Sequence, residues 1–226
     1  METWLRLRSD PAPAALNMAV DETLLLHVPQ LNQPVLRFYS WNEPAASFGY
    51  FQRFAEVSRA TSLRPLVRRP TGGGIVPHDN DWTYSLAFPP SHPWYALKAV
   101  ESYRRIHDWV RAAFEEIGVA ATLASEAQKQ VAGQCFSGAE RFDVLLQDRK
   151  IAGAAQRRTR DGLLIQGSIQ PPAGLKRASW ETALCHWAAR QWHVQWRDWP
   201  WPSNLEQSSR QLVLTKYSVG VFTERR

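Results

Sequence analysis

The sequence predicts an α+β fold, and three observations support it. Short runs rich in β-branched and aromatic residues, bounded by Pro, Gly or Asn, form two blocks, at residues 35–88 and 119–170. Apolar residues spaced three and four apart between Trp94 and Ile117 indicate a long helix between the blocks. The later strands are joined by tight turns, which favour an antiparallel meander. The two blocks are therefore expected to pack as two sheets of one domain.

The first half of the chain is predicted to contain six strands and one helix. Residues 4–8 (WLRLR) favour a strand, and apolar residues three and four apart predict a helix over residues 13–28. Further strands are expected at residues 35–39, 45–49, 65–69, 74–77 and 82–88. The frequent strand breaks indicate short strands linked by tight loops.

The second half begins with the long helix, which is expected to end at Gly118. Strands are then predicted at residues 119–123, 141–146, 150–158 and 162–170. The last three are joined by turns at residues 147–148 and 160–162. A helix is expected at residues 178–192, a rigid proline-containing turn at 198–204, and a helical or irregular segment at 205–217.

Length and composition favour one globular domain spanning residues 1–226. The 44% hydrophobic content is sufficient for a sizeable core. Two cysteines are too few for a disulfide framework, and no secretory signal or long apolar run is found. These features predict a soluble, cytoplasmic protein with reduced thiols and no membrane association.

The charge balance favours acidic partners. The formal net charge is +6, and the sequence pI is about 9.6. The basic residues occur in scattered pairs, such as Arg68 with Arg69 and Arg157 with Arg158, without a lysine-rich block or a base-reading motif. An acidic protein is therefore a better candidate partner than nucleic acid.

The segment RRPTGGGIVPHD, which starts at Arg68, is a candidate ligand loop. Three consecutive glycines let backbone N–H groups approach a ligand and adopt positive φ without penalty. A glycine-rich hairpin with solvated arginines is the alternative. The flanking residues favour the ligand loop, because a turn alone requires none of them: Arg69, Pro70, Thr71, His78 and Asp79.

Other motifs accompany this loop along the chain. They are NMAVDETL from Asn17, RFYSW from Arg37, GYFQ from Gly49, KIAGAAQRR from Lys150, IQGSI from Ile165 and TKYS from Thr215. In this order they resemble the biotin and lipoate protein ligase superfamily, in particular its lipoate ligases and octanoyltransferases. The resemblance spans nearly the whole chain. It implies one catalytic domain with a larger mixed or antiparallel sheet and a smaller antiparallel sheet flanked by helices, and no separate C-terminal accessory domain.

The resemblance also implies the chemistry and the partners. Members attach an acyl group to a lysine of an acidic carrier domain, by ATP-dependent ligation through an adenylate, by octanoyl transfer from acyl carrier protein, or by octanoyl transfer between two carrier domains. The implied partners are acyl carrier protein and lipoyl carrier domains, such as H protein or E2 subunits. The residues expected to bind substrate are Arg69, Thr71, Gly72, Gly73, Gly74, His78, Gly153, Ala155 and Gly167.

Cys135 discriminates between these chemistries. An adenylate is already activated, whereas transfer from a thioester gains from a covalent relay through a thiol. Cys135-Phe136 resembles a Cys-Phe loop that precedes the motif lysine in octanoyltransferases, although the Pro-Ser of that loop is missing. Lys150 is expected to favour the thiolate and to hydrogen-bond the acyl oxygen. An inert buried thiol is the alternative for Cys135.

Cys185 is the rival nucleophile, because another octanoyltransferase branch carries its thiol after the motif lysine. Its helical surroundings, with Leu184 and Trp187 beside it, favour a packing role. The small residues around Gly153 and Gly167 fit a tunnel for an alkyl chain, and burying an octanoyl tail is worth on the order of 5 kcal/mol. Tight sheet packing is the alternative. No metal site is predicted from His186 and His193, since no third ligand is near.

The sequence thus predicts an octanoyltransferase that forms a Cys135 thioester, takes its acyl group from acyl carrier protein and needs no cofactor. An ATP-dependent lipoate ligase that requires ATP and Mg²⁺ is the second candidate. A carrier-to-carrier octanoyl amidotransferase and a non-catalytic carrier-binding protein remain as further alternatives. The third glycine, Gly74, resembles the ligase loop as much as the transferase loop.

Overall fold

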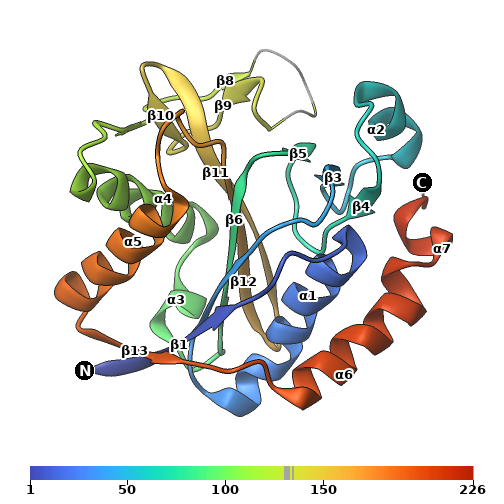
Figure 1. Cartoon of the computed structure of the whole chain (residues 1–226), viewed down its shortest axis with the longest axis horizontal. Helices are drawn as coiled ribbons and strands as arrows, with labels where there is room; N and C mark the ends of the chain where they lie inside the picture. The colour runs from blue at the N-terminus through green and yellow to red at the C-terminus, as the bar shows by residue number, and fades with distance from the viewer. Residues whose placement is uncertain (130–132, 134, 226) are drawn as a thin grey trace.

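The computed structural model describes residues 1–129, 133 and 135–225. Within them the larger sheet consists of β1 (Glu2–Arg8), β2 (Val35–Tyr39), β6 (Trp82–Phe88), β7 (Thr122–Leu123), β10 (Val144–Leu146), β11 (Arg149–Thr159), β12 (Gly162–Ile169) and β13 (Val194–Asp198). Their order is β13-β1-β2-β6-β12-β11-β10-β7 (Figure 1). The sheet is mixed, because β1 pairs in parallel with β2 and β13 while the other neighbours are antiparallel.

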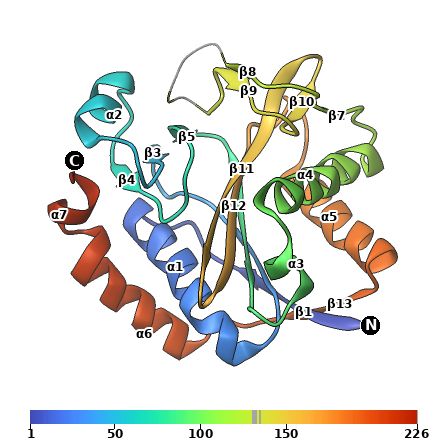
Figure 2. The same ribbon diagram turned by 180° about the vertical axis from the view of Figure 1, so that it is seen from behind.

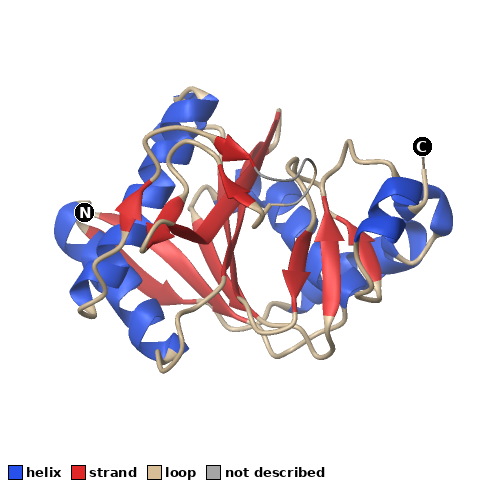
Figure 3. Cartoon of the chain, turned by 90° about the horizontal axis from the view of Figure 1, so that it is seen from above, coloured by secondary structure: helices blue, strands red, loops and turns tan. Residues whose placement is uncertain are grey.

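The smaller sheet consists of β3 (Ala45–Phe48), β4 (Leu66–Arg68) and β5 (Val76–His78), in the order β4-β3-β5. It lies beside the larger sheet, on the side that carries the C-terminus (Figure 3). The β3–β4 pair is parallel and the β3–β5 pair is antiparallel, so this sheet is mixed and not antiparallel as expected. Helix α2 (Phe54–Ala60), which the sequence analysis missed, provides the crossover that a parallel pair requires.

The two blocks of strands do not form one sheet each, and this prediction was wrong. Strands β2 and β6 of the first block continue into β12 and β11 of the second, with β6 paired to β12 over its whole length. All seven residues of β6 are buried, which a strand achieves when both of its edges are paired and both faces are covered. The predicted meander of β10, β11 and β12 is confirmed.

Helices cover both faces of the larger sheet (Figures 1 and 2). On one face lie α4 (Ala99–Glu116) and α5 (Arg177–Gln191), and on the other lies α1 (Ala14–Leu31) with α6 (Ser203–Leu212) against it. The alternation of β6 explains the division: Trp82, Tyr84, Leu86 and Phe88 join the core under α4 and α5, whereas Ala87 packs under α1.

The predicted helix at residues 94–117 is two helices. The short α3 (Pro93–Ala96) is separated from α4 by Leu97 and Lys98, whose ψ angles of 144° and 151° are extended. The break lets the Arg158 guanidinium donate to the carbonyl oxygens of Tyr95 and Leu97. The remaining elements are a hairpin of β8 (Gln128–Lys129) and β9 (Gly138–Ala139), a π-helix η1 (Val213–Tyr217) and α7 (Gly220–Thr223). Of the described residues, no helix is long and apolar enough to span a membrane.

Candidate functional site

A cavity lies between the two sheets, and it is called the inter-sheet cavity below. Seven of the eleven residues singled out from the sequence line it: Arg69, His78, Cys135, Lys150, Gly153, Ala155 and Gly167. Cys135 and Lys150, which are fifteen positions apart in the chain, therefore face one space. Further lining residues were not anticipated, among them Ser47, Phe136, Gln166 and Ser168.

The Cys135 segment runs alongside the glycine loop. Its backbone N–H donates to the carbonyl oxygen of Ile75 at 3.0 Å, and the Ile75 N–H donates to the carbonyl oxygen of Gly133 at 2.7 Å. The N–H of Gly74 donates to the Cys135 Sγ at 3.1 Å. The Cys135 sulfur is therefore partly exposed, lines the cavity and is held by a backbone N–H.

The glycines of the loop let neighbouring groups approach its backbone closely. Gly73 has φ +87°, a conformation that favours glycine, and an added Cβ would lie 2.8 Å from Arg69 Nη2. Gly49, at the end of β3, approaches so closely that an added Cβ would lie 1.9 Å from the carbonyl oxygen of Gly73. The glycine loop is therefore held between β3 and the Cys135 segment, and Gly72 by contrast faces open space.

Arg69 holds the loop from inside the protein. Its buried guanidinium donates to the carbonyl oxygen of Gly72 at 3.0 and 2.6 Å and to that of Gly74 at 2.7 Å. Burial lowers the pKa of Arg69, and the neighbouring Cys135 opposes that effect. Arg69 and the Gly74 N–H are thus both neighbours of the Cys135 sulfur, and the predicted effect of Lys150 on that sulfur stays a prediction.

Lys150 is paired with a carboxylate that the sequence analysis did not single out. Its Nζ lies 2.7 Å from Asp143 Oδ2, and the two side chains are 6% and 0% exposed. Asp143 also accepts from the Tyr103 hydroxyl at 2.5 Å and from the Glu140 N–H at 2.6 Å. Gly153 lies under the lysine, since a Cβ there would be 2.7 Å from Lys150 Cε. Lys150 is thereby fixed at the cavity wall.

Titratable groups behind this ion pair are neutral near pH 7. Burial raises the pKa of Tyr103 well above its usual range, and the Asp143 carboxylate adds to that effect. Burial lowers the pKa of His107 to about 4. Tyr103 and His107 therefore add no charge to the surroundings of the Lys150–Asp143 pair.

His78 is held from three sides. Its Nδ1 lies 2.8 Å from Asp81 Oδ2, and its Nε2 lies 2.8 Å from Ser47 Oγ. The Trp41 indole stacks on its ring at 3.8 Å. Ser47 also accepts from Arg69 at 3.3 Å, so a hydrogen-bonded chain links His78 to the arginine beside Cys135.

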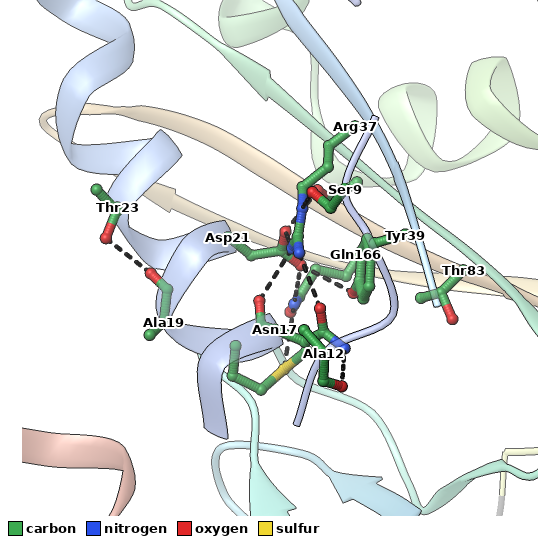
Figure 4. A network of polar contacts seen from close by, with 12 residues as sticks. Ser9, Ala12, Asn17, Ala19, Asp21, Thr23, Arg37, Tyr39, Thr83 and Gln166 are labelled. Carbon is green, nitrogen blue, oxygen red and sulfur yellow. Dashed lines mark hydrogen bonds and ion pairs between the residues drawn. The ribbon is translucent and has the colours of Figure 1, made fainter. Parts of the chain in front are cut away.

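A buried polar network under the cavity explains the NMAVDETL and RFYSW motifs (Figure 4). Thr71 donates to Gln166, and the Gln166 amide donates to Asp21 at 2.7 Å. Asp21 is also paired with Arg37 at 2.7 Å, and it accepts from the Tyr39 hydroxyl. Thr71 thus reaches this network and not the cavity lining. Because the polar atoms of the buried Asp21–Arg37 pair all have hydrogen-bond partners, this network fixes the position of α1 against the sheet.

The small residues of β11 and β12 face different surroundings. Gly153 and Ala155 lie on the cavity side, paired with Ser168 and Gln166. A Cβ on Gly167 would lie 2.1 Å from the Tyr84 ring, so that ring fills the space on the side where a side chain would point, while Gly167 itself lines the cavity. The small side chain of Ala155 leaves room in the cavity.

Cys185 is away from the inter-sheet cavity. It lies in α5, is 5% exposed, and belongs to the core shared by α4, α5 and the larger sheet. Burial raises the pKa of its thiol to about 11, so the thiolate is scarce at neutral pH.

Comparison with known proteins identifies the family. The model of the Lipoyl protein ligase A/B catalytic domain matches residues 13–171. Proteins named Octanoyltransferase LipM are 36% identical over 182 residues in Halalkalibacterium halodurans and 38% identical over 181 residues in Kyrpidia tusciae. Each alignment covers 75% of this chain and 66% of the relative, so the chain matches about two thirds of the length of these relatives.

Solved structures show the same fold. A putative lipoate protein ligase from T. acidophilum with bound lipoic acid has a TM-score of 0.81 at 20% identity, over 99% of both chains. A lipoate-protein ligase A bound with ATP has a TM-score of 0.80 at 20% identity, over 98% of both chains. The predicted α+β class with a larger and a smaller sheet is confirmed. Because the family model covers well over half of its 226 residues, the protein belongs to the lipoyl protein ligase A/B catalytic domain family.

Proposed function

We propose that this protein is an octanoyltransferase that moves an octanoyl group from acyl carrier protein to the lysine of a lipoyl carrier domain through a Cys135 thioester. The observation that carries the proposal is the presence of Cys135 and Lys150 in one cavity, with a backbone N–H on the sulfur. The names of the curated relatives support the reaction class. The proposal treats residues 1–226 as one cytoplasmic catalytic domain.

The residues suit two successive acyl transfers. The Cys135 sulfur attacks the thioester carbonyl, a new C–S bond forms, and the donor leaves as its thiol after gaining a proton. The lysine amine of the acceptor then attacks the Cys135 thioester, loses a proton, forms an amide and releases Cys135. In both steps negative charge develops on the acyl oxygen, and Lys150, fixed by Asp143 at the cavity wall, is placed to stabilise that charge.

A ligase would use the same residues differently. ATP and Mg²⁺ would supply the activation, and Arg69 with the glycine loop would have to cradle the phosphate of an acyl adenylate. The buried Arg69 guanidinium is engaged by the carbonyl oxygens of Gly72 and Gly74, and the Gly74 N–H is directed to the Cys135 sulfur. This arrangement favours the transferase, which needs no cofactor, over the ligase.

Intact-protein mass spectrometry tests the covalent step. After mixing with octanoyl acyl carrier protein, we expect one octanoyl adduct that hydroxylamine removes and that peptide mapping assigns to Cys135. The high pKa of the buried Cys185 thiol predicts no adduct at that position. An adduct on Cys185, or a protein that turns over without any adduct, would contradict the proposal.

A further inference from the structure

The turn formed by residues 49–52, called the rim turn below, contacts both loops of the site. The Tyr50 N–H donates to the carbonyl oxygen of Thr71 at 2.8 Å, and Gly49 approaches Gly73 closely. The Gln52 side chain donates to the carbonyl oxygen of Gly133 at 3.0 Å, in the segment that leads to Cys135. A protein that lands on the rim turn is therefore next to the cavity that contains Cys135.

Arg68 makes the rim turn rigid. Its buried guanidinium donates to the carbonyl oxygens of Tyr50 at 2.8 Å and Gln52 at 2.6 Å. The same group donates to the carbonyl oxygens of Phe222 and Thr223, so the C-terminal segment is fastened to the turn. A surface that is ordered before binding loses less conformational entropy on association.

Phe51, in the middle of the rim turn, is left open to solvent. It is 87% exposed, and among the described residues it is the only exposed aromatic side chain. The Tyr50 ring contacts it edge to face at 5.1 Å. A phenylalanine on an ordered turn beside the inter-sheet cavity is a candidate for a binding contact, because aromatic side chains, Phe included, are enriched at protein interfaces.

Two arginines lie over the Tyr50 ring of this pair, and a third follows the rim turn in the chain. The Arg225 guanidinium lies 3.8 Å from the centre of the Tyr50 ring, and that of Arg157 lies 4.7 Å from it. Arg53, next to the rim turn, has a side chain that is 73% exposed, with Glu56 at 3.6 Å. The rim turn therefore combines an apolar contact with positive charge, a surface complementary to an acidic protein with an apolar spot.

We propose that the rim turn, through Phe51 and its neighbouring arginines, docks the acidic carrier domain that accepts the acyl group. The inference rests on the proposed function. A lysine carries its amine on a flexible four-carbon stem, so the accepting domain must touch the rim of the cavity for that amine to reach Cys135. The chemistry that recognises the partner is an acidic surface with an apolar side chain beside the accepting lysine.

Binding tests this inference without relying on catalysis. A lipoyl carrier domain is titrated into the wild-type protein, Phe51→Ala and the matched control Val100→Ala, which truncates an exposed side chain on α4. We expect Phe51→Ala to weaken binding about tenfold, or about 1.4 kcal/mol. Val100→Ala should bind like the wild type. Arg53→Glu should slow association at low salt, and high salt should remove most of that difference.

Other outcomes separate the inference from the proposed function. Equal affinities of Phe51→Ala and wild type for the lipoyl domain would overturn the docking assignment. So would a result in which Phe51→Ala binds acyl carrier protein more weakly but binds the lipoyl domain normally. In parallel, the rate at which a small octanoyl thioester acylates the enzyme is measured, and this rate should be the same for the wild type and Phe51→Ala. If the wild-type protein forms no octanoyl enzyme, the proposed function is contradicted. The affinity of Phe51→Ala for the lipoyl domain still decides the role of Phe51.

Discussion

Replacing Cys135 by serine is expected to lower octanoyl transfer from acyl carrier protein at least a thousandfold. The substitution removes the thiol that we propose as the nucleophile, and the loss corresponds to about 4 kcal/mol of transition-state stabilisation. Serine is close to cysteine in shape and also accepts a hydrogen bond, so the contact from the Gly74 N–H can remain and the fold should be unchanged. Initial rates of lipoyl-domain modification, measured with a thermal melt of each protein, provide the test.

Cys185→Ser is the matched control for this experiment. Cys185 lies in the core under α5, away from the cavity, and its replacement should affect stability more than rate. If Cys135→Ser keeps normal turnover while Cys185→Ser loses it, the nucleophile has been misassigned.

Replacing Lys150 by methionine is expected to lower the rate of transfer at least a hundredfold, or about 3 kcal/mol. Methionine keeps much of the aliphatic stem over Gly153 but removes the charge from the cavity wall. The same change leaves the buried Asp143 carboxylate without the Lys150 cation, with the Tyr103 hydroxyl and the Glu140 N–H as its donors within the described part of the chain. Breaking a buried pair in this way costs about 3 to 5 kcal/mol of stability. Single-turnover rates and denaturant unfolding should therefore both change.

A double variant separates chemistry from folding. Lys150→Met combined with Asp143→Asn leaves no unpaired charge, so it should recover part of the lost stability. It should remain at least a hundredfold slower than wild type, because the cation that we propose for the acyl oxygen is still missing. A double variant that is stable and transfers at the wild-type rate would exclude Lys150 as the polarising group.

Much of the fold was predictable because local patterns dictate it. The tight turns between β10, β11 and β12 predicted the antiparallel meander, and that meander carries Lys150 and Gly153. The partition of strands between sheets could not be predicted in the same way. Whether β6 pairs with β12 depends on long-range burial of both of its faces, which the order of strands in the chain does not encode.

The site was predictable where a motif concentrates unusual residues, as in the glycine loop. Asp143 was missed because a single carboxylate in the segment RFDVLL forms no recognisable sequence pattern. Only the fold places it 2.7 Å from Lys150. Arg68 and Arg69 look alike in the sequence. One fastens the C-terminal segment to the rim turn and the other holds the glycine loop, and only the three-dimensional placement of their acceptors distinguishes them.

Transfer in the absence of nucleotide is the most direct test of the central claim. A thioester donor carries its own activation, so the protein should modify a lipoyl domain from octanoyl acyl carrier protein with no ATP present, and free octanoate or lipoate with ATP and Mg²⁺ should give no product. Product from free lipoate and ATP, formed equally well by the Cys135→Ser variant, would contradict the thioester mechanism and identify a ligase that acts through an adenylate.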